Sequence, residues 1–179
     1  MVKKIKLEEI KKIRELTGAG IADAKEALLG ASSFDEALKI LKSKGAKILE
    51  KKSERSASQG IVASYIHLQG KVGAMVELKS ETDFVARSEP FQKLAYDLAV
   101  QVAGMDPLYL TAKDVPASKK KEIEDFETFC KEKCLLEQPL IKDPNKTVGE
   151  LIQEVALQVQ ENIGVARFVR FAVGEKNND

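Results

Sequence analysis

The sequence of 179 residues contains no tryptophan, a single histidine (His67) and two cysteines, Cys130 and Cys134. One imidazole and two thiols cannot supply the four ligands of an all-Cys/His zinc site, and so few cysteines are typical of a reducing compartment. Aromatic residues make up only 6% of the chain, which argues against a stacking platform for nucleic-acid bases. We therefore expect neither a metal centre nor direct nucleic-acid binding.

Long apolar runs are also missing, because no stretch of about 18 apolar residues occurs, as a membrane-spanning helix requires. Residues 1–9 are basic but contain no apolar core of a secretory signal, and their acidic residues argue against an organelle transit peptide. These features predict a cytoplasmic protein that does not bind membranes.

Charge of one sign is not in excess, since the chain has 29 basic and 28 acidic residues and a net charge of +1. A general nucleic-acid coat would need a basic surface. The balance is uneven, because residues 1–58 are net basic and the remainder of the chain is net acidic. An acidic partner surface could therefore use the basic first third.

Three short patterns with helical spacing occupy the first 45 residues, and they cover residues 7–16, 21–29 and 34–43. A Thr-Gly-Ala-Gly turn separates the first two, and Gly45 is the expected end of the third. We expect residues 1–45 to form a three-helix module. Residues 46–59 are predicted to form a basic connecting helix or linker that leads into a joint at residues 56–58.

Alternating apolar residues then predict a hairpin, with strands over residues 62–68 and 72–78 around a Gln-Gly turn. Helices are expected after Ser88, over residues 118–133 and after Thr147, and a third strand over residues 165–173. The predicted fold class is α+β, with a three-stranded antiparallel sheet and helices packed on one face. Residues 60–174 would form this core, followed by a polar tail at residues 175–179.

Residues with reactive side chains do not form a pattern for bond chemistry. His67 lies in a predicted strand and is interpreted as a half-exposed sheet histidine. The glycine-rich turn at residues 17–20 lacks the Walker pattern of a phosphate loop. Cys130 and Cys134 are interpreted as ordinary reduced cysteines, and lysines 119–121 as a solvated helix start. We expect no catalytic residue, no cofactor and no enzyme activity.

Residues 81–84 (Glu-Thr-Asp-Phe) are unusual, because an apolar ring follows an acid where a buried strand gives way to a helix. In one interpretation Phe84 folds back onto the protein's own core and Asp83 caps a turn. In the other, Phe84 protrudes and enters another protein, as an aromatic anchor beside a charge does at interaction hot spots. The residues alone leave both interpretations open.

Several strings along nearly the whole chain resemble the bacterial elongation factor Ts family, and they occur in the family's order. The most specific is Glu-Thr-Asp-Phe-Val-Ala-Arg at residues 81–87. The other strings lie at residues 17–28, 64–67, 73–77, 135–139 and 167–171. The resemblance implies a guanine-nucleotide exchange factor for the GTPase elongation factor Tu. It also implies a ubiquitin-associated-like (UBA-like) three-helix domain followed by an α+β core.

The resemblance further implies which residues contact the partner. Asp83 and Phe84 would enter the nucleotide domain of elongation factor Tu and disturb its Mg²⁺ coordination, while Thr82 and Val85 shape the loop. A second set in the N-terminal module would touch a helix of the same domain, and it consists of Arg14, Ile21 and Ala22. Exchange of this kind makes and breaks no bond.

Three departures from the family pattern stand out. Ala22 replaces a large methionine that is common in the family, Ser80 stands where a cysteine is common, and the segment at residues 118–136 is short. Longer members carry two core halves, whereas this chain has room for one, so pairing into a homodimer is left open. One alternative function also stays open, in which the UBA-like module is a polypeptide-binding adaptor without exchange activity.

Overall fold

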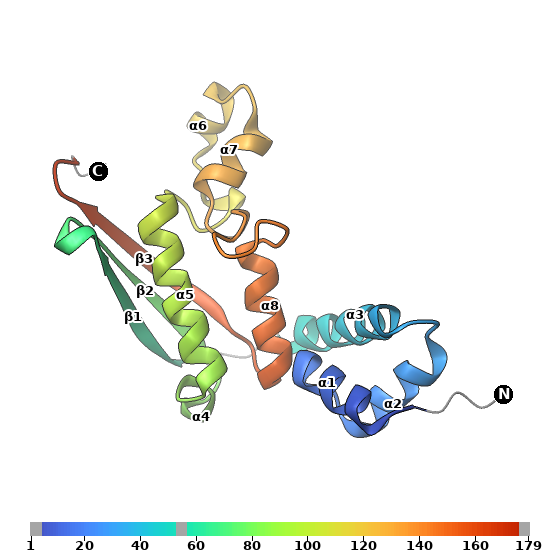
Figure 1. The fold of residues 1–179 in the computed structure, drawn as a ribbon. Helices are drawn as coiled ribbons and strands as arrows, with labels where there is room; N and C mark the ends of the chain where they lie inside the picture. The colour runs from blue at the N-terminus through green and yellow to red at the C-terminus, as the bar shows by residue number, and fades with distance from the viewer. Residues whose placement is uncertain (1–4, 53–56, 176–179) are drawn as a thin grey trace.

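The computed structural model describes residues 5–52 and 57–175, and three helices open the chain (Figure 1). These helices are α1 (Leu7–Thr17), α2 (Ile21–Gly30) and α3 (Phe34–Lys52). Their shared core is small and rich in alanine, and its buried members are Ile13, Ala24, Ala27, Leu28, Ala31, Ala37 and Leu41. Small side chains let the helices approach closely, and the predicted three-helix arrangement is confirmed.

Two glycines of these helices serve different purposes. Gly18 ends α1 in the left-handed conformation, with a φ of 64°. Gly45 lies inside α3, so its predicted role as the end of that helix is wrong. The glycine is instead required because α3 and α8 (Val148–Val159) approach each other closely at this position. A Cβ atom at Gly45 would clash with the side chain of Leu157 in α8. Helix α3 continues to Lys52, within the predicted connecting region. Ser56 of the predicted joint lies outside the described residues.

The sheet contains three antiparallel strands in the order β1-β2-β3. They are β1 (Gln59–His67), β2 (Val72–Ser80) and β3 (Gly164–Ala172). A short 3₁₀ turn, η1 (Leu68–Gly70), joins β1 to β2, so the predicted hairpin is confirmed. Val76 of β2 lies opposite Ala63 on one side and Phe168 on the other. The middle strand is therefore hydrogen-bonded along both edges.

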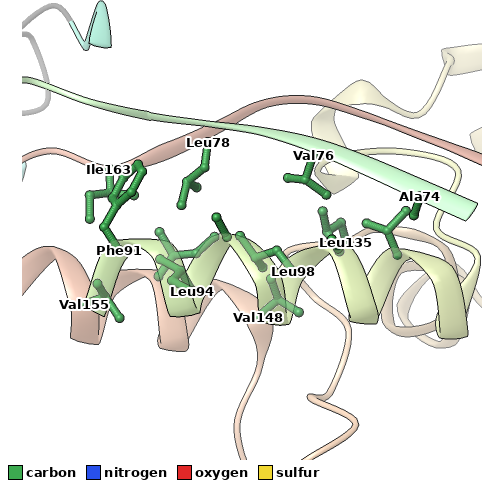
Figure 2. Packing of buried hydrophobic residues seen from close by; sticks show 14 of the residues in the cluster. Ala74, Val76, Leu78, Phe91, Leu94, Leu98, Leu135, Val148, Val155 and Ile163 are labelled. Carbon is green, nitrogen blue, oxygen red and sulfur yellow. The ribbon is translucent and has the colours of Figure 1, made fainter. Parts of the chain in front are cut away.

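The main core lies between the sheet and two helices, α5 (Glu89–Met105) and α8, which run side by side on one face (Figure 1). Figure 2 labels its central buried side chains, which are Ala74, Val76, Leu78, Phe91, Leu94, Leu98, Leu135, Val148, Val155 and Ile163. Alternate residues of β2 point into this layer, as period-two burial requires. The predicted α+β class, with helices on one face of a three-stranded sheet, is confirmed.

The opposite face of the sheet is exposed and carries large apolar side chains, together with the ion pair between Glu77 and Arg167. Large exposed side chains from all three strands lie on it, and they are Val62, Ile66, Met75, Val169 and Phe171. Their exposed fractions range from 40% to 64%. A contiguous exposed apolar surface commonly marks an interaction site on a globular protein.

The charged segment between α5 and α8 differs from the single helix predicted over residues 118–133. It contains η2 (Ala112–Asp114), α6 (Ala117–Glu122) and α7 (Phe126–Lys133). Asp125 separates the last two helices, because its carboxylate accepts from the N–H of Thr128 at 3.0 Å and starts a new helix. The helices α6 and α7 form a small lobe that projects beyond the ends of α5 and α8 (Figure 1).

The reactive residues outside the candidate site have inert surroundings. Cys130 and Cys134 are free thiols buried in the lobe. Burial, followed by a hydrogen bond with Cys130, raises the pKa of Cys134 to about 12, so this thiol stays protonated at neutral pH. His67 is exposed and stacks on Tyr65, whose hydroxyl oxygen lies 3.0 Å from Nδ1. These surroundings agree with reduced cysteines and a surface histidine on the sheet.

Candidate partner-binding site

The loop that the sequence singles out lies at the end of β2. It leads into one turn of helix, α4 (Asp83–Ala86), and Thr82 is its N-cap, with a hydroxyl that accepts from the N–H of Val85 at 3.4 Å. Ala86 is buried, and Val85 packs against the main core. Burial therefore fixes the inward side of α4, while its first two residues are exposed.

Phe84 is 85% exposed, the highest value among the large apolar side chains that the structure describes. The interpretation in which this ring packs into the protein's own core is therefore wrong. Burying a phenylalanine side chain contributes about 1.5–3 kcal/mol, and this free energy is available to a binding partner. Exposed rings of this kind are the anchors on which interface energy concentrates.

Asp83 lies beside the ring and forms an ion pair with Arg87, one helical turn later. The distance between Asp83 Oδ2 and Arg87 Nη2 is 2.9 Å, and the two side chains are 51% and 80% exposed. A solvated pair of this kind contributes only about 0–1 kcal/mol. An incoming partner can therefore separate the pair and use the carboxylate.

Hydrogen bonds hold the loop from both sides. The hydroxyl of Ser80, a buried residue, donates to the carbonyl oxygen of Thr82 at 2.9 Å. The hydroxyl of Ser88 donates to the carbonyl oxygen of Val85 at 2.7 Å. Glu161, in the turn after α8, accepts from the N–H of Thr82 at 3.0 Å and from its hydroxyl at 2.6 Å. The role of Glu161 could not be predicted from the sequence, because no local pattern links residues 79 positions apart.

The predicted N-terminal contact residues surround the turn between α1 and α2. Arg14 is exposed, and its Nε donates to the carbonyl oxygen of Ala19 at 3.1 Å. Ile21 is 61% exposed, and Ala22 beside it is exposed as well. All three predicted residues are therefore accessible beside this turn.

The turn after α8 connects this surface with the α4 loop. Gln160 ends α8 in the left-handed conformation, and its Nε2 donates to the carbonyl oxygen of Gly18 at 2.6 Å. The next residue, Glu161, holds Thr82. Consecutive residues of this turn therefore bond to the turn between α1 and α2 and to the α4 loop.

The arrangement suits recognition of another protein. It presents an exposed ring, aliphatic side chains and a carboxylate in an ion pair. Within residues 5–52 and 57–175, no group of three or more His, Cys, Asp or Glu side chains could hold a metal ion. No helix in the described part of the chain is long and apolar enough to cross a membrane.

The chain is similar to known proteins along nearly its whole length. A sequence model described as Elongation factor TS matches residues 7–128 and 123–175. Elongation factor Ts of Thermotoga sp. (strain RQ2) is 43% identical over 197 residues, covering 98% of this chain and 99% of that protein. The protein of the same name from Thermodesulfovibrio yellowstonii is 41% identical over 198 residues with the same coverage. That from Finegoldia magna is 41% identical over 206 residues, covering 95% of this chain and 92% of its own.

Proposed function

Because the chain belongs to the elongation factor Ts family and is thus a translation elongation factor, we propose that it promotes exchange of GDP for GTP on elongation factor Tu. The observation that carries this proposal is the exposed ring of Phe84 beside the carboxylate of Asp83. The protein makes and breaks no bond in this activity, so it is not an enzyme. Since translation takes place in the cytoplasm, the same proposal places the protein there.

In the proposed mechanism, the loop of residues 82–85 enters the nucleotide-binding domain of the GTPase. GDP is held in such domains by phosphate-loop amides, a lysine and Mg²⁺, and the metal is among the largest local charges. Phe84 inserts between helices near the nucleotide, and Asp83 brings a negative charge that disturbs Mg²⁺ and phosphate binding. Thr82 and Val85 maintain the shape of the loop.

The energetics follow from linkage. A factor that binds the nucleotide-free GTPase more tightly weakens nucleotide binding by the same factor, because coupling between two sites is reciprocal. Burial of one phenylalanine ring supplies about 1.5–3 kcal/mol, which corresponds to roughly one to two decades in an equilibrium constant. Larger effects require a second contact, and Arg14, Ile21 and Ala22 provide it in this proposal.

We test the proposal by replacing Phe84 with alanine. The Phe84→Ala variant is expected to stimulate release of a fluorescent GDP analogue from elongation factor Tu about 10- to 100-fold more slowly than the wild type, because it loses the ring's burial. The matched control is Leu108→Ala, which also removes an exposed apolar side chain but lies next to the lobe. This control is expected to leave release unchanged.

Equal release rates for the wild type and Phe84→Ala would remove the proposed role of the ring. The adaptor alternative, in which the N-terminal module recognises a polypeptide without exchange, would be favoured if residues 1–58 alone kept the full affinity in a pull-down. The division of the chain that we propose is a module at residues 1–45, a connecting region at 46–59, a core at 60–174 and a tail at 175–179.

We also propose that two copies of the chain pair through the open apolar face of the sheet. That face carries exposed apolar side chains from three strands around Met75, with the ion pair between Glu77 and Arg167 beside them. Longer members of the family carry two core halves, whereas this chain contains one sheet with helices on one side. A second copy supplies the missing counterpart and removes the apolar surface from water.

A further inference from the structure

The turn after α8 holds the α4 loop through two consecutive residues. The carboxylate of Glu161 accepts from both the N–H and the hydroxyl of Thr82, at 3.0 and 2.6 Å. The N–H of Asn162 donates to the Oε1 of Glu81 at 2.8 Å. The two segments therefore hold each other in both directions, immediately before the exposed ring.

The segment that carries Glu161 is itself fixed. Gln160 has a φ of 59° and turns the chain sharply at the end of α8. Ile163, two residues after Glu161, is only 6% exposed and lies in the main core. The carboxylate of Glu161 is therefore presented from a backbone that is anchored on both sides.

We infer that Glu161 is a positioning residue for the exchange activity, because it fixes Thr82 so that α4 presents Phe84 to the partner. This inference rests on the proposed function. Bonds to the N–H and the hydroxyl fix both the backbone and the side chain of Thr82, and Thr82 is the N-cap of α4. Without Glu161 the loop has more conformational freedom. Ordering the loop on binding then costs free energy, and the affinity for the partner falls.

The test replaces Glu161 and measures stimulated release of the fluorescent GDP analogue from elongation factor Tu. Loss of two hydrogen bonds in Glu161→Ala is expected to slow release about three- to tenfold. Glu161→Gln is expected to stay within about twofold of the wild type, since an amide oxygen can accept from the N–H and an amide N–H can donate to the hydroxyl. The control Glu127→Ala removes a glutamate ion-paired with Lys131 in α7 and is expected to change nothing.

A double-mutant cycle separates positioning from general stabilisation. If Glu161 acts through the ring, Glu161→Ala slows release by less than about twofold when Phe84 is already alanine, because coupled residues are not additive. A residue that only stabilises the fold would slow both backgrounds by the same factor, and that result would overturn the inference. Equal rates for the wild type and Glu161→Ala would overturn it as well.

The cycle also distinguishes the inference from the proposed function. If the wild type itself does not stimulate release, the proposed function fails. If Phe84→Ala slows release and Glu161→Ala does not, only the inference fails. Should Glu161→Ala not fold, the pair Thr82→Val and Thr82→Ser decides. Valine keeps the shape of threonine without its hydroxyl and is expected to slow release, whereas serine keeps the hydroxyl and is expected to retain most of the rate.

Discussion

Glu154 is the acidic side chain at the contact between the N-terminal helices and α8. Its carboxylate forms ion pairs with Lys42 of α3 and with Lys146, the latter at 2.9 Å. Burial favours the neutral acid, but the hydrogen bonds from Lys42 and Lys146 outweigh it and hold the pKa of Glu154 below its ordinary value. The carboxylate therefore stabilises the folded state in its charged form.

This direction predicts how stability depends on pH. The unfolded chain titrates Glu154 near the ordinary value of about 4.3, and the folded chain titrates it lower. The stabilisation is therefore complete above the unfolded pKa and is lost as pH falls through the folded pKa. The melting temperature of Glu154→Gln is expected to lie below that of the wild type at pH 7, with a gap that shrinks as the pH falls below about 4.

The control for this measurement is Glu127→Gln, which changes an exposed glutamate of α7 and is expected to show only a small gap. A gap for Glu154→Gln that stayed constant from pH 7 to pH 3 would contradict the proposed cause.

Single residues show where sequence reasoning ends. Phe84 could be selected as unusual from its neighbours, but its orientation could not, because it depends on Val85 and Ala86 packing against a distant core. The contact between Thr82 and Glu161 left no signal at all in the sequence, since each residue alone is an ordinary polar side chain in a turn.

At the scale of elements, the turn between α1 and α2 packs directly on the end of α8. A Cβ atom at Gly18 would clash with the backbone carbonyl oxygens of Leu157 and Gln158, and the φ of 64° disfavours any side chain. The left-handed conformation and the clash together predict that Gly18→Ala destabilises the protein by about 2–4 kcal/mol. Urea denaturation of the variant and the wild type measures this difference.

The matched control is Gly30→Ala at the end of α2, where an added Cβ would meet nothing within 4 Å. This variant is expected to be neutral or slightly more stable, because alanine restricts the unfolded chain. Equal destabilisation by both substitutions would show that the contact between the module and α8 does not constrain Gly18.

Elements that depend on local signals were predictable, and those that depend on distant contacts were not. The capping box of Thr147 and Glu150 identified the start of α8, and alternation identified the strands. The length of α3 was not predictable, since Gly45 reads as a helix end unless the approach of Leu157 is known. The break before α7 required knowing that Asp125 bonds locally rather than continuing the helix.

At the scale of the whole molecule, the open face of the sheet predicts the oligomeric state. Sedimentation of the wild type at micromolar concentration is expected to give a dimer. Met75→Asp places a charge at the centre of that face, between Ser64 and Val169, and is expected to give a monomer because an unpaired charge cannot be buried cheaply.

Met75→Leu is the matched control, since it keeps an apolar side chain of similar volume and is expected to remain dimeric. A wild-type protein that sediments as a monomer at every concentration would rule out pairing through the sheet.

The middle strand β2 continues directly into the turn that carries Phe84, and its two edges are both paired. The ring therefore follows a strand that is paired with a neighbour on each side. Complexes of preorganised surfaces form with little backbone rearrangement. The association rate constant should accordingly be set by diffusion and orientation of the two proteins. The dissociation rate constant should depend on how deeply the phenyl group is buried in the partner.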